Sequence, residues 1–269
     1  MLPLEALPAG EARALEAVLF DLDDTVLDAG RLGLAAYGAL YALADAGLLL
    51  VAVTGRPLGW AEVLARQWPI EGVVAENGAV SVARTTGGVA VVDAAGADRA
   101  RRTEWLDALV ATLRREFPDL VPADDVGARR ADRTFDVGEH QTVAPARVEA
   151  VARRARELGA RTVRSSIHLH VTLDGADKAS GALAFLAPRL GGDRTRIRRL
   201  AAFVGDSEND APCFAAFSTT IGVANLRGRP TVPPRYVTRS PAGAGFAEAA
   251  ALLLARRRAP PETDPAGRW

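Results

Sequence analysis

Two stretches of the chain combine a run of apolar residues with a cluster of carboxylates. The first is "LFDLDDT", which contains Asp21, Asp23 and Asp24. The second is "FVGDSEND", which contains Asp206 and Asp210. If both apolar runs are buried parallel strands, their carboxyl ends lie at the same edge of a sheet. Carboxylates that meet there repel one another unless a cation neutralises them, and an all-oxygen environment favours Mg²⁺.

Three further residues suit a phosphate group. Thr54 and Gly55 follow another apolar run and offer a hydroxyl and a backbone N–H group at a strand-to-helix turn. Lys178 is the only lysine among 33 basic residues, and it adds a compact positive charge next to a turn rich in Gly, Ala and Ser. With the carboxylates, these residues indicate chemistry on a phosphate.

The elements that must position these residues alternate between strands and helices on both flanks of the chain. The predicted strands are 17–23, 48–55, 72–80, 199–206, 219–225 and 235–240, and the predicted helices are 31–47, 60–68, 178–190 and 245–258. The strands are short, continuously apolar runs, as expected for strands that are buried on both faces. This alternation predicts an α/β fold with a doubly wound, Rossmann-like parallel sheet.

The middle of the chain has a different pattern. Its predicted helices are 104–117 and 145–160, and its predicted strands are 87–93, 133–139 and 162–173, the last with the polar alternation of a half-exposed strand. We therefore predict an inserted α+β cap domain over residues 82–173. The core domain then comprises 1–81 and 174–258, and a flexible, proline-rich tail covers 259–269.

Composition argues against several classes of protein. The 269 residues include 33 acidic and 33 basic residues, and the basic ones are scattered. This pattern gives no support to a nucleic-acid or membrane partner. The single cysteine, Cys213, rules out an internal disulfide and is typical of a reducing compartment. The start of the chain does not resemble a signal peptide, so we expect a cytoplasmic protein. We also expect a monomer or homodimer that acts on a small molecule.

The motifs "DLDDT", "VTGR", Lys178 and "GDSEND", in this order, resemble those of the haloacid dehalogenase (HAD) superfamily of phosphotransferases. The insertion between the second and third motifs is similar to the type IIB cap. The stretches "ENGA" and "GDSENDAPCF" resemble the Cof-like and sucrose-phosphatase-like branch of sugar-phosphate phosphatases. The resemblance implies a Mg²⁺-dependent phosphatase of a small phosphomonoester, with a sugar phosphate as the expected substrate.

The resemblance also implies roles for the acidic residues. Asp21 would be the nucleophile that attacks phosphorus and forms an aspartyl-phosphate. Asp23 would protonate the leaving oxygen and then take a proton from the hydrolytic water. Mg²⁺ would be held by Asp21, the backbone carbonyl of Asp23 and Asp206, with Asp210 close in support.

The remaining motif residues would bind the phosphoryl group. Thr54, with Gly55, would hold the group during transfer, and Asn209 would position the fourth-motif loop. Lys178 would contact both the phosphoryl oxygens and the nucleophile, which a rotatable ammonium does better than a planar guanidinium. Asp24 departs from the first motif of this branch, which more often has glycine at that position. Its carboxylate either caps the following turn or adds negative charge near the metal.

Other polar residues have two interpretations each. Arg56 either grips an anion of the substrate or caps the turn after Thr54. Asn77, in "ENGA", contacts either substrate or a neighbouring loop. Ser166, His168 and His170 alternate along one predicted strand and so share a face. That face either contacts substrate or faces solvent, and a metal site at the two histidines has no third ligand in view.

Two other functions stay open. A phosphomutase of the phosphomannomutase type would need cap arginines to grip a second phosphate, and Arg129, Arg130 and Arg133 could form such a cluster. A catalytically silent sugar-phosphate-binding domain is the second alternative. It is disfavoured because the nucleophile, the acid and the metal ligands expected from the family are all present.

Overall fold

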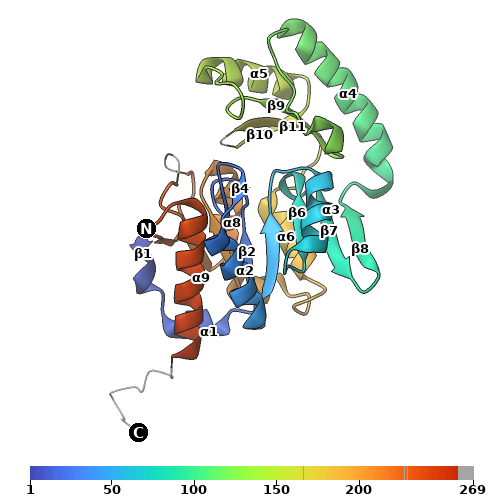
Figure 1. Ribbon diagram of the computed structural model, residues 1–269. Helices are drawn as coiled ribbons and strands as arrows, with labels where there is room; N and C mark the ends of the chain where they lie inside the picture. The colour runs from blue at the N-terminus through green and yellow to red at the C-terminus, as the bar shows by residue number, and fades with distance from the viewer. Residues whose placement is uncertain (166, 227, 229, 260–269) are drawn as a thin grey trace.

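The computed structural model describes residues 1–165, 167–226, 228 and 230–259. Figure 1 shows two lobes stacked one above the other, with the first and the last described segments of the chain both in the larger one. We call the nine-stranded sheet with its helices the large lobe, and the three-stranded sheet with its helices the small lobe. The predicted tail lies almost wholly outside the described residues, as does Ser166.

The sheet of the large lobe has the order β1-β14-β13-β12-β2-β5-β6-β7-β8. Its strands are β1 (Leu2–Pro3), β2 (Ala17–Phe20), β5 (Leu49–Val53), β6 (Gly72–Ala75), β7 (Val80–Thr85), β8 (Gly88–Asp93), β12 (Ala201–Gly205), β13 (Thr219–Gly222) and β14 (Tyr236–Val237). The strands from β1 to β6 pair in parallel, and β7 and β8 pair antiparallel. β2 lies between β5, the next parallel strand along the chain, and β12, which comes much later in the sequence. The strand order therefore reverses at β2, and the predicted doubly wound sheet is confirmed.

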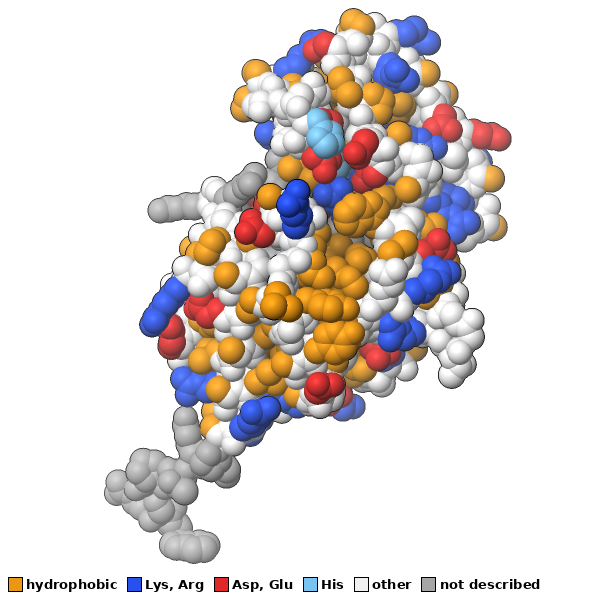
Figure 2. Space-filling model, in the orientation of Figure 1, with side chains coloured by type: hydrophobic (Ala, Val, Ile, Leu, Met, Phe, Trp, Pro, Cys, Tyr) orange, Lys and Arg blue, Asp and Glu red, His pale blue; other side chains and the backbone are white. Residues whose placement is uncertain are grey.

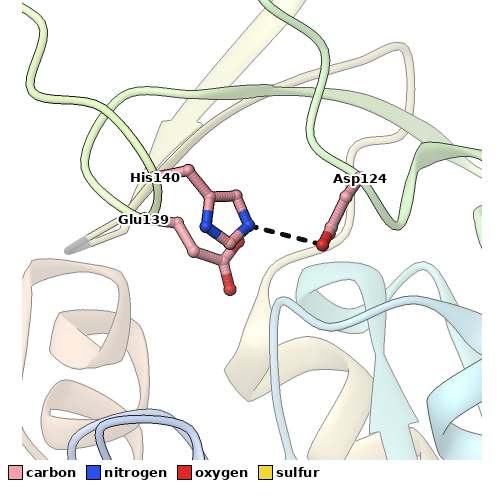
Figure 3. A group of neighbouring side chains, drawn as sticks. All are labelled: Asp124, Glu139 and His140. Carbon is pink, nitrogen blue, oxygen red and sulfur yellow. Dashed lines mark hydrogen bonds and ion pairs between the residues drawn. The ribbon is translucent and has the colours of Figure 1, made fainter.

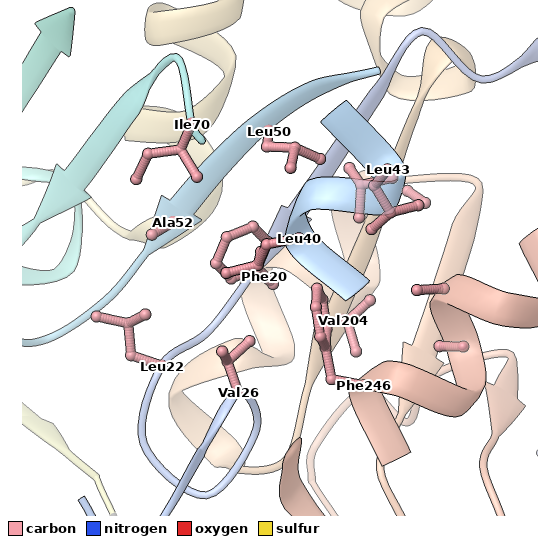
Figure 4. Close-up of a cluster of buried hydrophobic side chains, with 14 of the residues drawn as sticks. Phe20, Leu22, Val26, Leu40, Leu43, Leu50, Ala52, Ile70, Val204 and Phe246 are labelled. Atoms are coloured by element: carbon pink, nitrogen blue, oxygen red, sulfur yellow. The ribbon is translucent and has the colours of Figure 1, made fainter. Parts of the chain in front are cut away.

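Helices cover both faces of this sheet because successive strand side chains point to opposite faces. One face packs against α1 (Ala9–Ala14), α2 (Leu34–Asp45), α3 (Leu58–Gln67) and α9 (Ala242–Arg258). The other face packs against α6 (Lys178–Leu186), α7 (Arg194–Leu200) and α8 (Ala211–Ala216). Figure 4 shows the first cluster, which includes Phe20 of β2, Leu40 of α2 and Phe246 of α9, and the ring centroids of Phe20 and Phe246 lie 5.2 Å apart. Neither the helices of the large lobe nor any other helix in the described ranges is long and apolar enough to cross a membrane.

The small lobe is an antiparallel sheet of order β10-β11-β9 with two helices on one face. Its elements are α4 (Arg99–Glu116), β9 (Asp132–Asp136), α5 (Pro145–Glu157), β10 (Arg161–Arg164) and β11 (His168–Thr172). Apolar residues of β9 and β11, such as Phe135 and Val171, pack under the helices. The intervening polar residues of the same strands face the large lobe.

Short elements complete the chain. They are the 3₁₀ turns η1 (Leu4–Ala6), η2 (Glu76–Gly78), η3 (Gly96–Asp98), η4 (Val126–Ala128) and η5 (Glu208–Asp210), and the strands β3 (Leu27–Asp28) and β4 (Arg31–Leu32). The turns η2 and η5 follow the carboxyl ends of β6 and β12. They therefore lie at the edge of the sheet where the predicted site residues gather.

Three details of the sequence prediction differ from the structure. The hairpin β7–β8 extends the sheet of the large lobe, so this lobe reaches Asp93 and not residue 81. The predicted strand 72–80 breaks at η2, where Glu76 and Asn77 have φ of 48° and 53°. The predicted half-exposed strand 162–173 is the hairpin β10–β11, whose second strand is buried. Alternation of residue types cannot show which sheet a strand joins or what covers its polar face.

Candidate active site

The carboxyl ends of the central strands bring the predicted acidic residues together. Asp21 follows β2, and Asp206 and Asp210 follow β12, with carboxylate oxygens of all three within 4.8 Å of one another. The Nζ atom of Lys178 lies 2.9 Å from Oδ1 of Asp21 and 2.7 Å from Oδ1 of Asp210. All four side chains are buried. The acidic tips of two strands and the only lysine therefore share one site.

Lys178 is held in place by the start of its helix. Asp177 caps α6: its carboxylate accepts a hydrogen bond from the backbone N–H of Ser180, and the Ser180 hydroxyl accepts one from the backbone N–H of Asp177. Burial by itself would lower the pKa of Lys178, but Asp21 and Asp210 raise it above its usual value. The lysine is therefore a fixed positive charge that touches two carboxylates at once.

The acidic group fits a divalent cation. Burial raises the pKa of Asp206 to about 8, with repulsion from Asp21 and Asp210 adding to the effect. Burial likewise raises the pKa of Asp21 to about 7, although Lys178 opposes the shift. Oδ1 of Asp206 accepts a hydrogen bond from Thr25, while the buried Oδ2 has no partner in the described part of the chain. An unpaired carboxylate oxygen beside other oxygen ligands suits Mg²⁺.

Asp210 and Asn209 organise the loop after β12. Oδ2 of Asp210 accepts the backbone N–H groups of Asp206 and Ser207, at 2.9 and 3.2 Å. Oδ1 of Asn209 accepts a hydrogen bond from the Ser207 hydroxyl at 2.6 Å. Because both oxygens of Asp210 already have hydrogen-bond partners, Asp206, with its unpaired oxygen, offers a freer ligand to a cation than Asp210 does.

Asp23 is paired with Arg56. The guanidinium donates to both carboxylate oxygens of Asp23, at 2.9 and 2.8 Å, and to Glu139 of the small lobe at 3.2 Å. It also stacks 4.6 Å from the ring centroid of Trp60. The hydrogen bonds of the Arg56 guanidinium are thus made with carboxylates of the protein, and they orient Asp23.

The turn after β5 contains the predicted phosphate ligands. The Thr54 hydroxyl accepts the backbone N–H of Arg56 at 3.0 Å. The backbone N–H of Asn77 donates to the carbonyl of Thr54, and the buried Oδ1 of Asn77 has no partner among the described residues. Gly55 lies so close to the small lobe that an added Cβ would stand 3.2 Å from the His170 ring. These contacts explain why a glycine follows Thr54.

The small lobe closes the site from above with two histidines. His168 bonds to Glu139 through Nε2 at 2.8 Å, and His170 bonds to Asp132 through Nδ1 at 2.8 Å. Both rings are buried, which excludes the solvent-facing alternative. A cavity between the lobes is lined by Asp21, Asp23, Gly55, Arg56, Ser165, His168, His170, Ser207 and Asn209. Figure 2 shows acidic and histidine side chains gathered where the two lobes meet.

Glu76 and Arg129 join the two lobes, a role that the sequence does not predict for either residue. The carboxylate of Glu76, at the end of β6, accepts the backbone N–H groups of Leu58, Arg130, Ala131 and Asp132. Arg129 donates to the carbonyl of Gly55 at 2.8 Å and pairs with Asp125 and Asp132. The strand-end position of Glu76 in "ENGA" is the one signal in the sequence, because its partners in the small lobe are more than 50 residues away.

A second group of possible ligands lies at the rim of the site. Figure 3 shows Asp124, Glu139 and His140, with Nε2 of His140 3.4 Å from Asp124. Both oxygens of Glu139 already bond to Arg56 and His168. The side chains of Asp124 and His140 are 67% and 63% exposed. This group extends the ion pairs of Glu139, and we assign no metal to it.

The three arginines considered for a phosphomutase do not converge. Arg129 is enclosed by acidic residues of the small lobe, as described above. Arg130 lies 3.5 Å from Asp93, and Arg133 pairs with Asp107 at 2.8 Å. Each arginine has a separate carboxylate partner, so the three do not form a shared binding site for a second phosphate.

The fold and the polar edge of its sheet define the class of protein, a HAD-type phosphatase with a type IIB cap. Solved structures with this fold include a Thermoplasma acidophilum protein, with a TM-score of 0.71 and 18% identity over 89% of this chain and 98% of that one. Another is the sucrose-phosphatase from Synechocystis in complex with sucrose and phosphate, with a TM-score of 0.62 and 19% identity over 89% and 98% of the two chains.

The family model described as sucrose-6F-phosphate phosphohydrolase matches residues 15–231, and the chain belongs to this family of phosphoric monoester hydrolases. Curated relatives include a phosphoglycolate phosphatase from Pyrobaculum neutrophilum, 30% identical over 89% of this chain and 96% of that protein. A phosphoglycolate phosphatase from Methanothermobacter thermautotrophicus is 29% identical over 87% and 97% of the two proteins.

Proposed function

We propose that the protein is a Mg²⁺-dependent phosphatase of a small phosphomonoester, a sugar phosphate in the first instance, that works through an aspartyl-phosphate on Asp21. The observation that carries the proposal is the contact of Lys178 with Asp21 and Asp210, next to the unpaired oxygen of Asp206. Asp21, Asp206 and the backbone carbonyl of Asp23 would hold the ion, with Asp210 in support. When bound, Mg²⁺ supplies the positive charge that lets a carboxylate approach a phosphate dianion.

The reaction proceeds in two steps. A carboxylate oxygen of Asp21 attacks phosphorus, the ester P–O bond breaks, and the leaving oxygen takes a proton from Asp23. Asp23 then takes a proton from a water molecule, which attacks the aspartyl-phosphate and releases inorganic phosphate and free Asp21. Arg56 orients Asp23, and at least one of its two hydrogen bonds to the Asp23 carboxylate must break when Asp23 carries a proton. Glu139, and Asp125 at 3.8 Å, are its alternative partners.

The groups around the phosphoryl position stabilise its charge. Lys178 and the Thr54 hydroxyl bind phosphoryl oxygens, and the backbone at Gly55 lies beside them. Asn77 places an unpaired amide oxygen near the same turn, where a hydroxyl or water can donate to it. Asn209 keeps the loop after β12 in shape through Ser207.

The small lobe acts as a cap that opens and closes. The site lies between the lobes beneath His168 and His170, so substrate enters when the lobes separate. Two connections link the lobes, from η3 into α4 and from β11 into α6. Closure excludes bulk water from the first step and adds residues of the small lobe to the substrate pocket.

The test is release of inorganic phosphate from sugar, polyol and glycerate phosphates and from phosphoglycolate, measured with Mg²⁺ and with EDTA. We expect phosphate release only with Mg²⁺, and no release by Asp21→Asn. This result would also exclude a catalytically silent sugar-phosphate-binding domain. Interconversion of hexose 6- and 1-phosphates without phosphate release would instead indicate a mutase. Equal release in EDTA and Mg²⁺ would remove the metal assignment.

A further inference from the structure

The face of the small lobe above the site is built around His170. This residue lies on β11, the central strand of the lobe's sheet, and its ring is buried. Atoms Cε1 and Nε2 of the ring both approach Gly55, at 3.2 Å from where a Cβ would be. The Nε2 edge therefore faces the turn after Thr54, in the cavity that Asp21 and Asp23 also line.

Asp132 determines which nitrogen of His170 carries hydrogen. Oδ2 of Asp132 lies 2.8 Å from Nδ1, and the Thr134 hydroxyl lies 3.1 Å from the same atom. Burial by itself would raise the pKa of Asp132, but Arg129 and His170 lower it to about 2. An ionised carboxylate can only accept hydrogen bonds, so Nδ1 must donate.

The other ring nitrogen is left as an acceptor. Burial lowers the pKa of His170, which favours the neutral ring. A neutral imidazole with hydrogen on Nδ1 has its lone pair on Nε2. In the described ranges of the chain, Nε2 has no hydrogen-bond partner, while Nδ1 has two near neighbours. A lone pair thus points into the small cavity between the lobes, where no described residue donates a hydrogen bond to it.

We propose that His170, oriented by Asp132, accepts a hydrogen bond from a hydroxyl of the leaving alcohol and so selects phosphomonoesters with a hydroxyl close to the ester carbon. The proposal rests on the phosphatase function proposed above and adds a substrate class to it. A carboxylate in the same place would bring negative charge against the lone pair, with ionised Asp132 directly behind the ring. Arg56, the cation in the same cavity, is already paired with Asp23 and Glu139.

The test compares three substrates that differ only beside the ester carbon. They are 2-hydroxyethyl phosphate, ethyl phosphate and phosphoglycolate, in which the ester carbon bears a hydroxymethyl group, a methyl group and a carboxylate, respectively. For the wild-type enzyme with Mg²⁺ we expect kcat/KM for 2-hydroxyethyl phosphate to exceed the other two by about tenfold, the usual effect of one hydrogen bond.

Two variants separate recognition from a structural role. His170→Asn keeps an amide that can donate to Asp132 but has no atom at the Nε2 position, so the preference for hydroxyl over hydrogen should fall to within about twofold of unity. Asp132→Asn can donate to Nδ1 and move the hydrogen to Nε2, so relative activity should shift toward phosphoglycolate. Asp107→Asn, which removes a surface carboxylate of the same lobe, is the control and should keep the wild-type ratios.

The outcomes are distinct. A wild-type preference for phosphoglycolate or for ethyl phosphate, or unchanged ratios in His170→Asn, would overturn the proposal. So would hydrolysis of 4-nitrophenyl phosphate with no activity on any of the three test substrates. Absence of Mg²⁺-dependent phosphate release from every substrate, including 4-nitrophenyl phosphate, would count against the proposed function itself.

Discussion

At the scale of single residues, the site depends on one cation between two buried carboxylates. Lys178 touches Asp21 and Asp210 and is 1% exposed. A buried charge is tolerated only when partners surround it. The ammonium can point its three donors at two carboxylates and a phosphoryl oxygen, which explains why this position is lysine in an arginine-rich chain.

This arrangement predicts the effect of changing Lys178. Lys178→Arg should lower kcat by at least about 100-fold, the scale on which a fixed donor stabilises a transition state. Lys178→Met should do the same and should also lower the free energy of unfolding by about 3–5 kcal/mol, because two carboxylates lose their partner. Steady-state kinetics and urea denaturation measure the two effects. Arg196→Lys, at an exposed ion pair, is the control. Near-normal turnover by Lys178→Arg would show that a compact charge is not required.

At the scale of elements, α6 and η2 interlock through two glycines. A Cβ at Gly181 of α6 would lie 2.6 Å from Cα of Gly78 and 2.8 Å from Val74. A Cβ at Gly78 would lie 2.1 Å from the carbonyl oxygen of Asp177, the cap of α6. This close packing holds the helix start, and thus Lys178, against the loop that contains Asn77.

A matched pair of glycine substitutions tests this packing. Gly181→Ala should lower the free energy of unfolding by about 1–3 kcal/mol, through overpacking, and should reduce kcat because α6 is displaced. Gly38→Ala lies in the exposed middle of α2, with nothing within 4 Å of its Cβ, and should raise stability by up to about 1 kcal/mol with unchanged activity. Denaturation curves and phosphate-release assays measure both. A Gly181→Ala protein as stable and active as wild type would contradict the close contact.

At the scale of the whole molecule, buried polar contacts join the lobes. Glu76 accepts backbone hydrogen bonds from residues 130–132, and Arg129 donates to the Gly55 carbonyl. Polar contacts can exchange with water when the lobes separate, whereas a large apolar interface would resist separation. A cap that opens in every catalytic cycle therefore suits this kind of junction.

The junction predicts a pH dependence of stability. Burial raises the pKa of Glu76 from its ordinary value of 4.5 to about 7, with a contribution from Asp132. Between these values the folded protein holds a proton that the unfolded chain releases. The free energy of unfolding therefore decreases as pH rises through this range, by at most about 1.4 kcal/mol per pH unit from this group, and the loss is complete above pH 7.

Glu76→Gln isolates this contribution, because the variant has no titratable group there and other groups cancel in the comparison. Urea denaturation at pH 5, 6, 7 and 8 should show the stability advantage of wild type over Glu76→Gln shrinking as pH rises. An advantage that stays constant or grows would show that Glu76 is ionised across the whole range.

Much of the large lobe and the centre of its site follows from local patterns. Continuous apolar runs that end in Asp21, Thr54 and Asp206 predict buried parallel strands, and parallel strands place their carboxyl ends at one edge. Lys178 stood out because it is the only lysine and occupies the third-motif position. These predictions need only the pattern of apolar residues and the order of the motifs along the chain, which are properties of the sequence itself.

Only the tertiary structure decided how the small lobe meets this edge. The pairing of Arg129 with the Gly55 carbonyl, and of Glu76 with backbone N–H groups of residues 130–132, joins segments 54 to 74 residues apart. Hydrophobic periodicity states which side of a strand is buried but not which polar groups will face each other across an interface. That choice depends on how two independently folded surfaces pack, because a buried polar group must find its partner wherever the packing places one.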